Sequence, residues 1–118
     1  MQSIRHQRVR ELLKREIGEV LRREISIEEG GLISVNDVGL AGDLKSATVF
    51  VGIVGNAAQR KRGEELLRQE HKRIQSMVGR AVVLKYTPQL RFVVVDSVER
   101  GNRVLEILSQ IEEDLPPS

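Results

Sequence analysis

The sequence contains residues with the functional groups for catalysis and metal binding, but none is arranged for either. The two histidines, His6 and His71, have neither a cysteine nor a second histidine three or four residues away, the spacing expected of a zinc site. There is no cysteine, which excludes thiol catalysis, iron–sulfur clusters and disulfides. No serine lies in a Gly-x-Ser-x-Gly elbow, and no Gly-x-x-x-x-Gly-Lys phosphate loop occurs. We therefore expect no enzyme, no metal and no cofactor.

The chemistry that the sequence favours is phosphate binding by clustered cations. The net charge of the 118 residues is only +2, but residues 1–95 carry 17 basic and 11 acidic residues, whereas residues 96–118 carry 2 and 6. Three basic stretches, at residues 5–10, 60–62 and 71–95, contain no acidic residue. Each is expected either to bind phosphate or to be a solvated charged face. They can meet on one side of a small domain. The candidate RNA-binding residues are Arg5, Arg8, Arg60, Lys61, Arg62, Lys72, Arg73, Arg80, Lys85 and Arg91.

Scarce aromatic residues limit how such a protein can recognise RNA. Phe50 and Phe92 lie in apolar runs and are expected in the core, which leaves Tyr86 as the candidate for base stacking. We expect binding through backbone and shape rather than through base reading. Two Gly-x-x-Gly strings, at 39–42 and 52–55, match the phosphate-binding loop of KH modules. Neither falls between two helices, so we interpret both as chance matches.

The elements that must position these residues follow from the spacing of apolar side chains. Steps of three and four predict helices over residues 3–25, 57–78 and 98–113, and β-branched runs predict strands over 32–38, 47–54 and 90–95. Residues 81–86 are expected to be an extended lead-in, because Pro88 disfavours one continuous central strand. Within the second helix, Gly63 and the Glu70–His71 pair are possible bends, and Gly79 is the expected end.

This order of elements predicts an α+β fold. The short link after the first strand favours an antiparallel hairpin, and a third strand reached by a helical crossover should lie parallel to its neighbour. The result is a three-stranded sheet with helices packed on one face. The length fits a single domain over residues 1–114, with a frayed tail at 115–118. No apolar run approaches a membrane span and no signal-peptide pattern opens the sequence, so we expect a cytoplasmic protein.

Three sequence segments carry a more specific resemblance to known proteins. They are Arg-His-Gln-Arg-Val at residues 5–9, Gly-Asp-Leu-Lys-Ser-Ala-Thr-Val-Phe-Val at 42–51, and Tyr-Thr-Pro-Gln-Leu-Arg-Phe at 86–92, followed by Asp96 and Ser97. With them the chain resembles bacterial ribosome-binding factor A over nearly its whole length. The resemblance implies a type II KH-like fold in the order α-β-β-α-(kink)-α-β-α. It also implies a non-catalytic, monomeric factor that binds the 30S subunit and assists maturation of 16S rRNA, including processing of its 5′ region, notably at low temperature. Assembly GTPases are possible further partners.

The resemblance also marks a departure. In the family an Ala-x-Gly kink joins the two helices, and here Glu70, His71 and Lys72 occupy that position. The Glu70 carboxylate would repel phosphate, whereas Lys72 and Arg73 remain usable. An alternative function is that of a protein–protein assembly module, because the acidic C-terminal helix and the Glu28–Glu29 turn could dock a basic partner.

Overall fold

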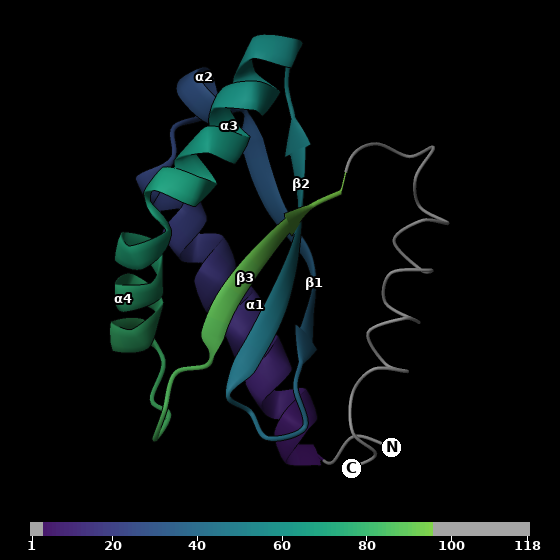
Figure 1. Ribbon diagram of the computed structural model, residues 1–118, viewed down its shortest axis with the longest axis vertical. Helices are drawn as coiled ribbons and strands as arrows, with labels where there is room; N and C mark the ends of the chain where they lie inside the picture. The colour runs from purple at the N-terminus through teal and green to yellow at the C-terminus, as the bar shows by residue number, and fades with distance from the viewer. Residues whose placement is uncertain (1–3, 96–118) are drawn as a thin grey trace.

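A computed structural model describes residues 4–95. The helix expected over 98–113 and the tail at 115–118 lie outside these residues. The described elements are α1 (Ile4–Glu24), α2 (Ile27–Gly30), β1 (Leu32–Leu40), β2 (Ser46–Val54), α3 (Ala57–Gln69), α4 (His71–Ala81) and β3 (Gln89–Val94) (Figure 1). Only α2 was not predicted. It forms because the Ser26 hydroxyl caps the backbone N–H of Glu29, and it ends at Gly31, which adopts φ 74°.

The three strands form one sheet in the order β1-β2-β3. The strands β1 and β2 are antiparallel, with a bulge between Val35 and Asp37, and β3 lies parallel to β2. The predicted α+β fold with a hairpin and a parallel third strand is thus confirmed. The central strand β2 alternates strictly, so Ala47, Val49, Val51 and Ile53 face the helices, and Phe50 faces the other way.

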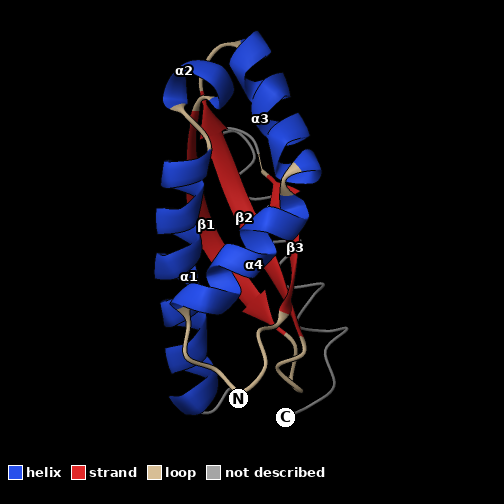
Figure 2. Ribbon diagram, turned by 90° about the vertical axis from the view of Figure 1, so that its left-hand side faces the viewer, coloured by secondary structure: helices blue, strands red, loops and turns tan. Residues whose placement is uncertain are grey.

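The helices α1, α3 and α4 cover one face of the sheet (Figure 2). Between the layers lies a core of fully buried side chains, each contributing about 1.5–3 kcal/mol on burial. Its centre consists of Leu13 and Ile17 from α1, Val49 and Val51 from β2, and Ile74 and Val78 from α4. These residues occupy the apolar stripes that the spacing predicts.

A glycine pair sets the contact between α2 and α3. A Cβ on Gly63 would lie 2.5 Å from the carbonyl oxygen of Gly30, and one on Gly30 would lie 3.3 Å from Gly63 Cα. Gly63 is a possible bend by sequence, but α3 runs through it unbroken. The close approach of the α2 and α3 backbones requires a glycine at this position, and the helix does not break there.

The helical segment after β2 divides at Glu70, which has φ −96° and ψ 12° and joins α3 to α4. The prediction that Gly79 ends this segment was wrong, since α4 continues to Ala81. Gly79 instead gives room to the loop that follows, because a Cβ there would lie 3.2 Å from Thr87 Oγ1. The expected extended lead-in at 81–86 is therefore mostly loop, and β3 begins at Gln89.

Candidate nucleic-acid interface

Three segments meet at one end of the molecule, the lower end in Figures 1 and 2. They are the start of α1, the β1–β2 turn at 41–45, and the last turn of α4 with the loop at 82–88 that follows it, and we call this region the turn end. A His6 ring nitrogen lies 3.0 Å from the carbonyl oxygen of Gly42, and the N–H of Gln89 donates to the carbonyl of Lys45 at 2.9 Å. These contacts hold the three segments together. The cations of the turn end are Arg5, Arg8, Lys45, Arg80 and Lys85.

The cations of the turn end are all exposed. Within residues 4–95, none of the five forms an ion pair with a carboxylate. The acid in the turn, Asp43, accepts a hydrogen bond from the backbone N–H of Lys45 at 3.0 Å. Nearby, Tyr86 is 75% exposed, and Lys85 Nζ lies 5.6 Å from the centre of its ring. The turn end therefore presents exposed positive charge beside an accessible aromatic ring.

Two side chains of α4 fix the strand that follows the Lys85–Tyr86 loop. Gln75 donates to the carbonyl of Pro88 and accepts from the N–H of Leu90, both at 2.8 Å. His71 Nε2 lies 2.6 Å from the carbonyl oxygen of Leu90, and because a carbonyl only accepts, this nitrogen carries the proton. The N–H and C=O of Leu90 point away from β2, so α4 satisfies groups that an edge strand would leave open.

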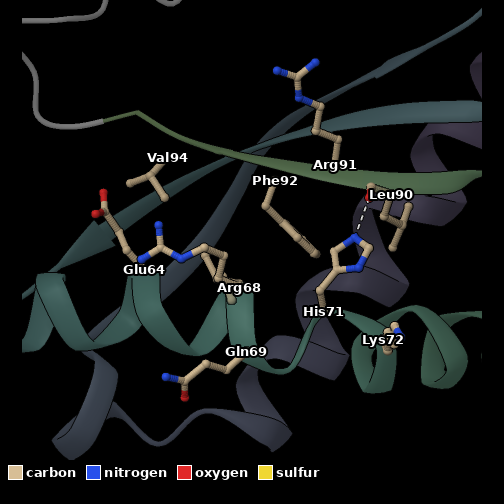
Figure 3. Close-up of a pocket in the computed structure, with 10 residues that line it drawn as sticks. Glu64, Arg68, Gln69, His71, Lys72, Leu90, Arg91, Phe92 and Val94 are labelled. Atoms are coloured by element: carbon tan, nitrogen blue, oxygen red, sulfur yellow. Dashed lines mark hydrogen bonds between the residues drawn. The ribbon is translucent and has the colours of Figure 1, made fainter.

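A groove of about 880 Å³ lies beside this contact, between α3, the start of α4 and β3 (Figure 3). Its apolar lining is Leu67, Leu90, Phe92 and Val94. Arg68 and Lys72 are the exposed cations on the helical side, with Glu64 one turn before Arg68. The His71 ring packs edge-on against Phe92, with centroids 6.0 Å apart. His71 is therefore a structural contact, and Lys72 is the predicted kink residue whose charge remains available.

The other predicted RNA-binding residues lie elsewhere. Arg60, Lys61 and Arg62 begin α3 at the opposite end of the molecule, since α3 follows a nine-residue strand that spans about 30 Å. Arg62 is engaged with Glu29 at 3.2 Å and Glu65 at 3.4 Å. The idea that all three basic clusters share one side does not hold.

Two further predicted cations lie outside the segments that define the turn end. Arg73 pairs with Glu24 at 3.1 Å and ties α4 to α1. Arg91 is among the residues that line the groove, but its side chain extends from β3 on the side opposite Phe92 and His71 (Figure 3). Arg73 is therefore engaged in an ion pair, whereas Arg91 is exposed on β3 opposite Thr48, three residues after Lys45 of the turn end.

Sequence reasoning did not single out Gln75 or Arg68. An uncharged glutamine inside a helix gives no pattern, because its role depends on a strand 15 residues away. Arg68 lies among Glu64, Glu65 and Glu70 in the sequence, so it did not count as part of an acid-free cluster. Only the groove shows that this cation lies beside β3.

Residues 4–95 contain no group of three or more His, Cys, Asp or Glu side chains able to hold a metal ion. Among the same residues, no helix combines the length and apolar character needed to cross a membrane.

Comparison with known proteins gives one consistent result. The sequence model of the family "Ribosome-binding factor A" matches residues 5–108. The chain is 38% identical over 114 residues to ribosome-binding factor A of Halothermothrix orenii, covering 97% of this chain and 93% of the relative. It is 40% identical over 114 residues to that of Akkermansia muciniphila, covering 97% and 90%.

Solved structures agree on the fold. The crystal structure of ribosome-binding factor A from Thermus thermophilus matches with a TM-score of 0.64 at 20% identity, covering 75% of this chain and 92% of that one. A homology model of the Thermus thermophilus factor, fitted into a cryo-EM map of a 30S complex, matches with a TM-score of 0.58 at 22% identity, covering 70% and 86%. By family match and by identity over nearly its full length, the chain belongs to the ribosome-binding factor A family.

Proposed function

We propose that this protein binds the small ribosomal subunit through the turn end, which contacts 16S rRNA. The observation that carries the proposal is the group of five exposed cations, unpaired within residues 4–95, beside the exposed ring of Tyr86. The fitted 30S complex of the Thermus thermophilus relative supports the same partner for this chain.

The binding would depend on charge and shape more than on base sequence. Each phosphate that a lysine or arginine neutralises releases condensed counterions, whatever the base beside it. One exposed ring can stack on one unpaired base, which adds about 1–3 kcal/mol without reading its edges. Gln75 and His71 fix the backbone from Pro88 to Leu90, so the loop bearing Lys85 and Tyr86 is anchored at its C-terminal end. This anchoring lowers the conformational entropy that the loop would lose on binding RNA.

The groove between α3, α4 and β3 provides a second contact region. Lys72 and Arg68 can bind phosphates at its edge, while its apolar lining can receive a base. The Glu64 carboxylate disfavours phosphate at the end of the groove near the middle of α3. We therefore place the RNA backbone nearer Lys72, between the groove and the turn end.

Family membership supports a proposal about the finer role. We propose that the bound factor assists 16S rRNA maturation, including processing of the 5′ region, and that this matters most at low temperature. We further propose that it acts in the cytoplasm as a monomer, alongside assembly GTPases, without cofactor and without catalysing a reaction itself.

Co-sedimentation with purified ribosomal subunits over a range of salt concentrations tests the proposal. We expect binding to small subunits and not to large ones. With about five phosphates neutralised, log K should fall against log salt with a slope of roughly −3 to −5. Binding to large subunits alone, or a small-subunit complex that is insensitive to salt, would reject the proposal.

A further inference from the structure

The strand β1 forms one edge of the sheet, and its two halves differ in how that edge is protected. Among residues 4–95, the order β1-β2-β3 leaves the outer side of β1 without a strand partner. In the second half, the N–H of Val38 donates to the Asp37 carboxylate at 2.8 Å, and a bulge between Val35 and Asp37 precedes it. A bulge and a charged side chain both hinder further strands from pairing with an edge. Residues 32–35 lie before these two features.

This first half of β1 presents open backbone groups. Residues 32–35 pair with β2 in a regular antiparallel register. In such a ladder, alternate residues of the edge strand direct their N–H and C=O groups away from the neighbouring strand. The four residues span about 13 Å. The stretch is therefore long enough to pair with a short extended segment.

A groove of about 390 Å³ lies beside the same stretch, between β1 and α1. Its strand side consists of Ile33, Ser34 and Val35, and its helix side consists of residues of α1 between Glu11 and Arg22. The groove thus follows the half of β1 that lies away from the β1–β2 turn, and it is separate from the turn end.

Gly18 of α1 lines this groove, and the packing of the described residues does not require a glycine there. A glycine in the interior of a helix costs about 1 kcal/mol relative to alanine. At Gly63 a close approach of two backbones explains the glycine, but within residues 4–95 a Cβ on Gly18 would meet only Arg22 Nη2, at 3.9 Å. Gly18 therefore leaves open space in the helix surface beside the edge of β1, where another chain can approach closely.

We propose that the edge of β1 and this groove form a docking site for an extended, acidic segment of a protein partner. The segment adds a strand beside residues 32–35, and its backbone N–H and C=O groups complement those of β1. The backbone of RNA offers phosphate oxygens, which the outward carbonyl groups would repel, so a peptide fits this edge better than RNA does.

The charges of the groove favour carboxylates on the partner. The charged lining residues are three cations, Lys14, Arg15 and Arg22, and one acid, Glu11. Arg15 also pairs with Glu16 at 3.5 Å and Arg22 with Glu19 at 2.5 Å. Lys14 is exposed and forms no ion pair within residues 4–95. The excess of positive charge therefore selects acidic side chains.

This inference goes beyond the proposed function and stands without it. The turn end and the edge of β1 are separate surfaces, so RNA and a protein segment would bind at the same time. The protein would then connect an RNA site to a protein site.

The test uses the full chain, ¹⁵N-labelled, and a phage-displayed library of random 12-residue peptides. We expect the selected peptides to carry acidic residues at alternate positions. A synthetic copy should shift the amide signals of residues 32–35 and of Gly18, but not that of Tyr86. Failure to select any peptide, or shifts confined to the turn end or to the groove beside His71, would overturn the proposal.

Two controls distinguish other occupants of the edge. A 12-nucleotide oligouridylate should leave the signals of residues 32–35 unchanged, and shifts there would assign the site to RNA instead. Diluting the protein without peptide should also leave these signals unchanged. A dependence on concentration would assign the edge to a second copy of the chain and overturn the proposal.

Variants of α1 provide an independent readout. Gly18→Gln fills the open space, so peptide affinity should fall at least tenfold while stability in urea stays equal or rises, because glutamine favours helix. Arg23→Gln, at an exposed position outside the groove, is the control and should keep the wild-type affinity. Lys14→Glu should weaken binding several-fold at low salt, with a smaller loss at high salt. Wild-type affinity in both Gly18→Gln and Lys14→Glu would contradict docking in this groove.

Discussion

The contact between α4 and β3 allows a quantitative prediction from one side chain. Gln75→Ala removes the acceptor of the Leu90 N–H and the donor to the Pro88 carbonyl, both held at 2.8 Å. Leu90 and Pro88 are buried, so water replaces the lost partners poorly. A buried backbone group without a partner costs about 1–3 kcal/mol. Gln75 itself is half-buried, which places each loss at the lower end and gives about 2 kcal/mol in total.

The assay is urea unfolding at 25 °C followed by circular dichroism. A loss of about 2 kcal/mol lowers the ratio of folded to unfolded protein about thirtyfold. Gln7→Ala is the control, because Gln7 is an exposed residue of α1 with the same change in side chain, and it should shift stability by only a few tenths of a kcal/mol. Gln75→Glu should fall between wild type and Gln75→Ala, since a carboxylate still accepts from Leu90 but cannot donate to Pro88. If Gln75→Ala is no less stable than Gln7→Ala, the hydrogen bonds of Gln75 to Pro88 and Leu90 do not stabilise the packing of β3 on α4.

Three other predictions concern packing, capping and charge. Gly63→Ala should lower stability by about 1–3 kcal/mol, because its Cβ would meet the Gly30 carbonyl. Gly18→Ala, whose Cβ meets only Arg22 Nη2 at 3.9 Å, should instead be neutral or raise the thermal midpoint, and equal effects of the two would refute the close approach of α2 and α3. Asn56→Ala removes the capping box with Gln59 and should lower the free energy of unfolding in urea by about 1 kcal/mol. An unchanged urea midpoint would show that the cap does not stabilise α3. Lys72→Glu should weaken small-subunit binding in co-sedimentation with little change in stability, whereas Arg73→Glu should lower stability by up to about 1 kcal/mol through loss of the Glu24 pair. The reverse order of the two charge effects would move the interface away from the groove.

The sequence predicted most of the local structure because local patterns determine it. The apolar stripe of α1 and the β-branched run of β2 give each element its type and the face that it buries. The division of the second helical segment at Glu70 also coincided with the polar pair Glu70–His71. The reason for that pair was not visible, because the acceptor of the His71 hydrogen bond is the carbonyl of Leu90, 19 residues later.

The spatial grouping of charges was the part that the sequence could not supply. The basic stretches at 5–10 and 60–62 read alike in sequence, but α3 starts where β2 ends and α1 starts beside the β1–β2 turn. Topology therefore places them at opposite ends of the sheet. Ion pairing also distinguishes two residues that are adjacent in sequence, because Arg73 pairs with Glu24 whereas Lys72 lies at the groove. Formal charge alone does not distinguish them.

The central claim is that the turn end contacts 16S rRNA, and a site-directed crosslink tests it most directly. A photoreactive phenylalanine analogue would replace Tyr86 at the turn end or, as the control, Val54 near the opposite end of the sheet, two side chains that are 75% and 69% exposed. After irradiation of the complex with small subunits, we predict a crosslink to 16S rRNA from position 86 and none from position 54. A crosslink to rRNA from position 54 alone, or crosslinks from position 86 to ribosomal proteins only, would contradict the account.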